Sequence, residues 1–115
     1  METILQRLTD LDEVQNALLV GKDGLIVAST MHSEDDEMVG AMSAAAFGSI
    51  TSYTSKISHG DSHHVVIETS NGTIQIEEAS DLILIVITRG RGNPGRVRLE
   101  MKKVCRQVVQ MVASY

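Results

Sequence analysis

The hydrophobic residues of this chain recur first at a helical period and then at the two-residue period of strands. A short amphipathic helix that ends near Asp10 is indicated by apolar residues at helical spacing, namely Ile4, Leu5, Leu8 and Leu11. Residues 14–20 and 25–29 are strand-like, and the sequence Gly-Lys-Asp-Gly at 21–24 predicts a tight turn between them. These two strands are therefore expected to form a hairpin.

The second half of the chain repeats these signals around two longer helices. A helix is predicted from about Asp35 to about Ile57, with Ser33 as its cap and four acids, residues 34–37, at its start. Strands are predicted at His63–Ser70, 73–77 and 82–87, and a final helix from about Pro94 to about Ser114. The pair Asn71-Gly72 predicts a type I′ turn between the first two of these strands.

The element order is helix, two strands, helix, three strands, helix (α-β-β-α-β-β-β-α) within a single domain, residues 1–115. Odd- and even-numbered residues of the segment 82–87 are all apolar, and in a strand they point to opposite faces. This strand must therefore be covered on both faces of its sheet. We therefore expect an α/β (α+β) fold, a three-layer α-β-α sandwich around a five-stranded antiparallel sheet.

The central helix carries no charged residue between Met38 and Ser55, about five turns. Its larger apolar side chains share one arc and are the expected core face: Val39, Met42, Ala46, Ile50, Tyr53 and Ile57. The opposite arc holds small residues: Ala41, Ala44, Ala45, Gly48, Thr51, Ser52 and Ser55. Charge-free helix backs are unusual in solvent, so the small face is predicted to pack on a second copy. The alternative is a mildly polar exposed surface.

The last helix has one apolar stripe, as a surface helix should. The stripe consists of Val97, Met101, Val104, Cys105, Val108, Met111, Val112 and Tyr115. Leu99 lies among the polar positions and is expected to be exposed. Cys105 lies on the apolar side, so a packed structural thiol is favoured over a nucleophile.

Charge and composition exclude several classes of function. The net charge is −5 and aromatic residues make up 3% of the chain, which disfavours nucleic-acid binding. No apolar run is long enough to cross a bilayer, so membrane insertion is not expected. The beginning of the chain lacks a signal-peptide pattern, and Cys105 is the single cysteine, which together predict a cytoplasmic protein.

No catalytic, metal or cofactor site is predicted. His59 and His63 have four-residue spacing, but Gly60 and Asp61 interrupt the helix and zinc needs three or four convergent donors. The adjacent His63 and His64 should point to opposite faces of a strand, as should Glu77 and Glu78. The glycine-rich segment 89–95 lacks the phosphate-loop lysine, which favours a mobile loop over a nucleotide site.

These features together resemble the roadblock/LC7 family, which includes a dynein light chain and bacterial activators of small Ras-like GTPases. The resemblance rests on the element order and on three stretches: the hairpin at residues 18–29 (Leu-Leu-Val-Gly-Lys-Asp-Gly-Leu-Ile-Val-Ala-Ser), the alanine-rich residues 41–46, and Asn93-Pro94-Gly95-Arg96-Val97-Arg98 before the last helix.

The resemblance implies a homodimer in which the central helices meet and the third strands pair, the latter through Val65 and Ile67. It also implies a non-catalytic scaffold that binds a small Ras-like GTPase and modulates its nucleotide cycle. The alternative is a small-ligand sensor or a general protein-interaction module without a GTPase partner. The scarcity of aromatic and convergent polar residues argues against the sensor.

Overall fold

The computed structural model describes residues 1–114, which form three helices and five strands in the predicted order. Their bounds are α1 Glu2–Thr9, β1 Val14–Gly21, β2 Ile26–Ser29, α2 Asp36–Lys56, β3 His64–Thr69, β4 Gly72–Ala79, β5 Leu82–Thr88 and α3 Pro94–Ala113. Tyr115, the last member of the predicted α3 stripe, lies outside the described residues.

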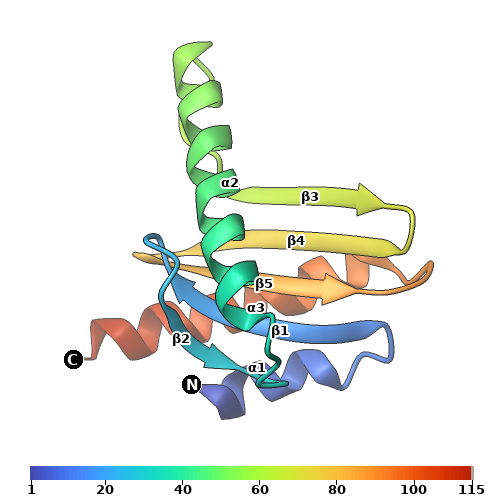
Figure 1. Cartoon of the computed structure of the whole chain (residues 1–115). Helices are drawn as coiled ribbons and strands as arrows, with labels where there is room; N and C mark the ends of the chain where they lie inside the picture. The colour runs from blue at the N-terminus through green and yellow to red at the C-terminus, as the bar shows by residue number, and fades with distance from the viewer. Residues whose placement is uncertain (115) are drawn as a thin grey trace.

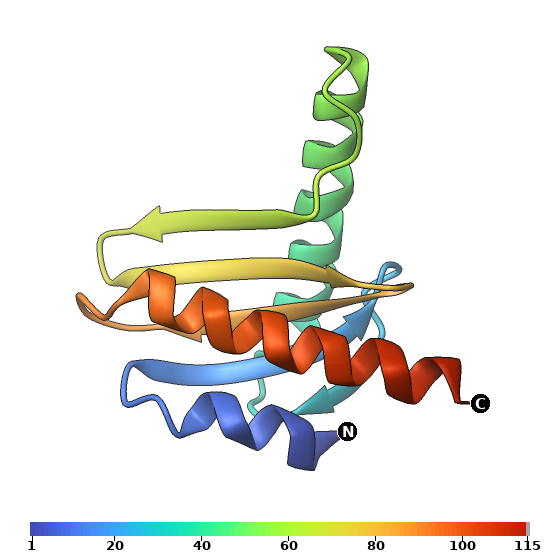
Figure 2. The ribbon, with the colours of Figure 1, turned by 180° about the vertical axis from the view of Figure 1, so that it is seen from behind.

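The five strands form one antiparallel sheet in the order β2-β1-β5-β4-β3. Helix α2 lies on one face of this sheet, and α1 and α3 lie side by side on the other (Figures 1 and 2). The predicted three-layer sandwich is therefore confirmed. The short strand β2 and the strand β3 are the two edges.

Strand β5 occupies the middle of the sheet because its side chains serve two cores. Leu84 and Val86 pack towards α1 and α3, whereas Ile83 and Ile85 pack towards α2. All four side chains are fully buried, as apolar residues at both parities predicted. The α3 stripe is confirmed from Val97 to Val108, while Met111 and Val112 are partly exposed at its end.

The face of α2 that meets the sheet differs from the predicted one. Gly40, Ala44 and Phe47 are buried against the sheet, whereas Met42 is 66% and Tyr53 63% exposed. Ile57, just past the helix, is also exposed, and Val39, Ala46 and Ile50 are only partly buried. The predicted core arc therefore lies along the flank of the helix: Val39 still packs against the core, whereas Met42 and Tyr53 are exposed.

Close approach explains why the helix is rotated relative to the prediction. A Cβ on Gly40 would lie 3.0 Å from the carbonyl oxygen of Gly24 and 3.3 Å from Val20 Cγ1. Gly24 has φ +92°, a conformation that glycine adopts without strain, and it brings the β1–β2 turn up against the helix. Small residues thus let α2 sit low on the sheet, and Phe47 fills the space that remains.

The start of α2 is fixed by a buried side chain. The N-cap is Asp35 rather than the predicted Ser33, whose Oγ instead accepts a hydrogen bond from the Asp35 amide. Asp36 is buried and accepts a 3.0 Å hydrogen bond from Asn16 Nδ2 on β1. This acid is therefore an anchor to the sheet and not only a favourable charge at a helix start.

The β3–β4 hairpin forms, but its turn is shifted by one residue. Thr69 pairs with Gly72, so Ser70 and Asn71 are the two central residues. Neither has positive φ, and the predicted type I′ geometry is therefore wrong. Gly72 is required for a different reason: a Cβ there would overlap the backbone of Thr88.

Candidate functional site

From Met38 to Tyr53, the outward face of α2 exposes large apolar side chains without any charge among them. Met38, Met42 and Tyr53 are exposed, as is Ile57 just past the helix end. Between them lie the small exposed residues Ala45 and Ser49. We call Met38, Met42, Ala45, Ser49 and Tyr53 the outward α2 face. An uncharged stripe of this length on a helix surface is typical of an interface.

The second half of α2 projects beyond the sheet. Figures 1 and 2 show that the helix crosses the sheet near β1 and β5 and continues past β3, with its end standing clear of the strands. Within residues 1–114, nothing pairs with the outer edge of β3. The projecting half-helix and the free strand edge therefore lie on the same side of the molecule.

The predicted dimer residues on α2 divide into two groups. Ala44 is 8% exposed and packs in the core beneath α2, which corrects its assignment to an outer face. Thr51 is partly buried beside it. The other five remain exposed and available to a partner: Ala41, Ala45, Gly48, Ser52 and Ser55.

Val65 and Ile67, the predicted residues of the third strand, are partly buried on the α2 side of the sheet. Val65 packs against the core under α2. Their strand is an edge, which sequence patterns alone could not establish. The backbone of this strand, more than these two side chains, is what lies open to a partner.

The histidine segment before β3 forms two separate polar networks. His63 Nδ1 lies 3.1 Å from Glu78 Oε1, and Lys22 Nζ donates to Glu78 Oε2 at 2.8 Å. On the α3 side, His64 Nδ1 lies 2.7 Å from Glu77 Oε1. The prediction that each adjacent pair splits between the two faces is therefore confirmed.

The His64 network is buried and joins β3 to α3. The His64 and Glu77 side chains are 6% and 10% exposed. His64 Nε2 lies 2.8 Å from Gln75 Oε1, and Gln75 Nε2 donates to the carbonyl oxygen of Pro94 at 3.0 Å. The edge strand is thus connected through β4 to the first residue of α3, and its position does not depend on backbone pairing alone.

These contacts set the charge state of the acids. Burial alone would raise the pKa of Glu77, but hydrogen bonds from His64 and Cys105 and the nearby charge of Lys102 hold the pKa below its usual value. The hydrogen bond from Lys22 lowers the pKa of Glu78, against a smaller opposing effect of burial. Burial, followed by the adjacent Glu77 carboxylate, raises the pKa of the Cys105 thiol. Cys105 is therefore a protonated structural thiol at neutral pH.

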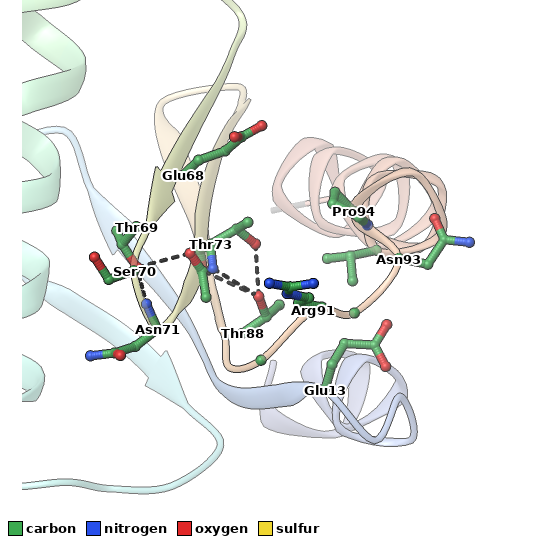
Figure 3. Close-up of a pocket in the computed structure, with 14 residues that line it drawn as sticks. Glu13, Glu68, Thr69, Ser70, Asn71, Thr73, Thr88, Arg91, Asn93 and Pro94 are labelled. Carbon is green, nitrogen blue, oxygen red and sulfur yellow. Dashed lines mark hydrogen bonds between the residues drawn. The ribbon is translucent and has the colours of Figure 1, made fainter.

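A polar hollow of about 630 Å³ lies between the β3–β4 turn and the β5–α3 loop. Figure 3 shows Thr73 and Thr88 on its wall, with their hydroxyl oxygens 2.7 Å apart, and the Arg91 side chain beside them. Asn93 Oδ1 caps α3 by accepting from the Arg96 amide. The lining combines these hydroxyls and amides with three charged residues, Glu13, Glu68 and Arg91.

Sequence reasoning missed three structural anchors of these surfaces: Phe47, the Asn16–Asp36 pair and Gln75. Phe47 is the only phenylalanine, and that rarity was the available signal for a core anchor. Gln75 is fully buried in a strand, but the sequence around it does not indicate that its side chain hydrogen-bonds to the carbonyl oxygen of Pro94. Such pairings join residues that are distant along the chain.

Among residues 1–114, no three or more histidine, cysteine, aspartate or glutamate side chains gather as metal ligands would. The described helices also include none with the length and apolar character needed to cross a bilayer.

Comparison with known proteins places these features in a family. The model of the roadblock/LC7 domain matches residues 1–88. The uncharacterized protein MJ1340 of Methanocaldococcus jannaschii is 33% identical over 112 residues, which cover 96% of this chain and 98% of that protein.

Solved structures show the same fold at low sequence identity. Myxococcus xanthus MglB superposes with a TM-score of 0.90 at 20% identity, covering 99% of this chain and 95% of that one. A roadblock/LC7 domain from Streptomyces avermitilis has a TM-score of 0.91 at 18% identity, with 98% of each chain covered. The family match, the similarity along nearly the whole chain and the shared fold agree, and the chain belongs to the roadblock/LC7 domain family.

Proposed function

We propose that the chain forms a homodimer through the outward α2 face and the free edge of β3, and that the dimer is a non-catalytic platform for a small Ras-like GTPase. The observation that carries the proposal is the uncharged outward α2 face, whose second half projects past the edge of its own sheet. Exposure of a projecting apolar helix to water is unfavourable, and burying it against a partner surface would stabilise it.

A second copy fits this requirement through a two-fold axis perpendicular to the sheet. Two β3 edges would then pair antiparallel and extend the two sheets into one, which satisfies backbone groups that an exposed edge leaves open. The projecting half of each α2 would lie over the sheet of the partner. The two α2 helices would then lie side by side on the same face of the joined sheet, where their exposed residues from Met42 to Tyr53, the small Ala45 and Ser49 among them, would allow close contact.

The GTPase partner is proposed from the family, whose members include activators of Ras-like GTPases. The candidate groups considered from the sequence are not arranged for catalysis: Cys105 is buried and protonated, and Glu77 and Glu78 lie on opposite faces. Any effect on GTP hydrolysis would therefore come from binding and positioning the switch regions of the GTPase, and not from chemistry carried out by this chain.

The dimer is tested by measuring mass in solution with sedimentation velocity. The wild type is expected at twice the monomer mass at micromolar concentration, and Met42→Glu as a folded monomer, because a carboxylate would be forced into an apolar contact. Leu99→Glu is the matched control, since Leu99 is 63% exposed on the opposite side of the molecule. A monomeric wild type, or a Met42→Glu dimer, would disprove the interface. Gly48→Glu, at the edge of the same face, should also weaken the dimer.

The GTPase is tested by affinity capture from the source cells with the tagged dimer, followed by mass spectrometry. Recovery of a Ras-like GTPase, with loss of its capture by the monomeric Met42→Glu chain, is the expected result. Multiple-turnover GTP hydrolysis by that GTPase, with and without the dimer, then separates an activator from a passive scaffold. Capture that includes no GTPase would favour a general interaction module instead.

A further inference from the structure

The outward surface of α3 is a second interface candidate, on the opposite side of the sheet from α2. Figure 2 shows α3 as the outermost layer of this side, running across the sheet beside α1. Five exposed basic residues follow its outward surface, which we call the basic ridge: Arg96, Arg98, Lys102, Lys103 and Arg106. The ridge spans residues 96–106, about 15 Å along a helix.

The charges of the ridge are largely uncompensated. Within residues 1–114, Lys103 forms an ion pair with Glu100 at 3.2 Å, and the other four basic side chains of the ridge form none, although the charge of Lys102 acts on the nearby Glu77 carboxylate. The Lys103–Glu100 pair is exposed, so its effect on the local field is small. The ridge therefore presents cations that an external anionic surface can neutralise.

Exposed apolar side chains lie among the basic residues of the ridge. Leu99 is 63% exposed and lies one helical turn before Lys103 and two before Arg106, on the same side of the helix. Val109 is also exposed, on the flank of the ridge. A leucine surrounded by cations on a helix that lies flat on the outside of a domain suits the boundary between lipid headgroups and acyl chains.

The rest of the chain has the opposite charge. Of its 15 acidic and 10 basic residues, one acid and seven bases follow Thr88. Three of the acids, Glu34, Asp35 and Glu37, are exposed at the start of α2, on the far side of the sheet. Three more, Glu2, Asp10 and Asp12, are exposed on and just after α1, which lies beside α3. Because the basic residues are concentrated on α3, an anionic surface would still favour an orientation in which the ridge faces it.

We propose that the basic ridge of α3 docks peripherally on an anionic lipid surface, with Leu99 entering the headgroup region. A convex ridge meets a flat surface along its length, whereas a protein partner would need a groove shaped to it. The ridge is complete within one chain, so the proposal stands whether or not the chain dimerises. Electrostatic attraction of this kind decays over about one Debye length from the surface, and the binding is therefore sensitive to salt.

The test is co-sedimentation of the full chain with vesicles of phosphatidylglycerol and phosphatidylcholine in equal parts, against vesicles of phosphatidylcholine alone. Binding is expected to the anionic vesicles only, and to be lost in about 0.5 M sodium chloride, where screening is strong. Lys102→Glu/Lys103→Glu should lower the affinity at least about tenfold, since each basic residue near the surface contributes to the attraction. Leu99→Ser should lower it several-fold at unchanged net charge.

The matched control is Lys22→Glu/Lys56→Glu, which changes the net charge equally but away from α3 and should lower binding far less. Circular dichroism confirms that each variant is folded. Absence of wild-type binding to the anionic vesicles, or equal losses in the two double variants, would overturn the proposal. Binding to soluble polyglutamate as tight as to vesicles, and indifferent to Leu99→Ser, would also overturn it and identify an acidic protein as the partner.

Discussion

The two glycines inside α2 allow a paired test of how the helix packs. Gly40 and Gly48 both lie in the helix interior, where replacement by alanine gains about 1 kcal/mol of helix propensity. An added Cβ at Gly48 meets nothing within 4 Å. Gly48→Ala should therefore show the gain in full and raise the free energy of unfolding of the monomer by about 1 kcal/mol.

At Gly40 the same change meets backbone. The new Cβ would lie 3.0 Å from the Gly24 carbonyl oxygen, in a turn where Gly24 has φ +92° and cannot shift freely. Overpacking of a tight site costs about 1–3 kcal/mol, which cancels or exceeds the gain in propensity. We therefore expect Gly40→Ala to be destabilising by about 1 kcal/mol, and the two variants to differ by about 2 kcal/mol.

The assay is equilibrium urea unfolding in the Met42→Glu background, so that dissociation does not contribute to the measured free energy. Equal effects of the two alanine substitutions would refute the reasoning, because both sites share the propensity term and differ only in the contact with the β1–β2 turn. A Gly48→Ala variant that loses stability would mean that α2 lies against other elements of its own chain at that point.

Two further predictions follow from the charged and buried groups. The pKa of Glu77 and of Glu78 is lowered on folding from 4.5, so their ionised forms stabilise the fold above that pH, and this contribution is lost as the pH falls through the folded pKa. The urea concentration at the unfolding midpoint should thus decrease as the pH is lowered below 4.5, and it should decrease less steeply in the Glu77→Gln variant. The same dependence of the midpoint on pH in the wild type and the variant would contradict the assignment. Cys105, whose pKa is raised by burial, should react with a thiol reagent at pH 8 only when the chain unfolds, as mass spectrometry along a urea series would show. Rapid labelling of the native protein would refute this.

Predictions that rest on one strong local signal were confirmed by the structure. The apolar run of β5 required cover on both faces, and this requirement placed helices on both sides of the sheet. The single stripe of α3 fixed its orientation from Val97 to Val108, because only one face could be buried. The two-residue period separated His63 from His64 and Glu77 from Glu78.

Predictions that depend on contacts between distant residues were less successful. The hairpin turn moved by one residue because Gly72 is needed where β4 passes the backbone of Thr88, a neighbour across the sheet. The cap of α2 moved to Asp35 because Asp36 binds Asn16 on β1. The β3 edge also became visible only when the strand order was known.

The sequence by itself determined the order of elements, the sandwich and the unusual character of α2, a long helix with no charged residue from Met38 to Ser55. Only the tertiary structure decided which way that helix faces. Its apolar residues surround the axis, so periodicity does not single out one buried side. Close backbone approach at Gly40, with Ala44 beneath the helix and Phe47 filling the remaining space, turns the arc of these three residues towards the sheet. The larger side chains Met42 and Tyr53 are left outside, where a partner can cover them.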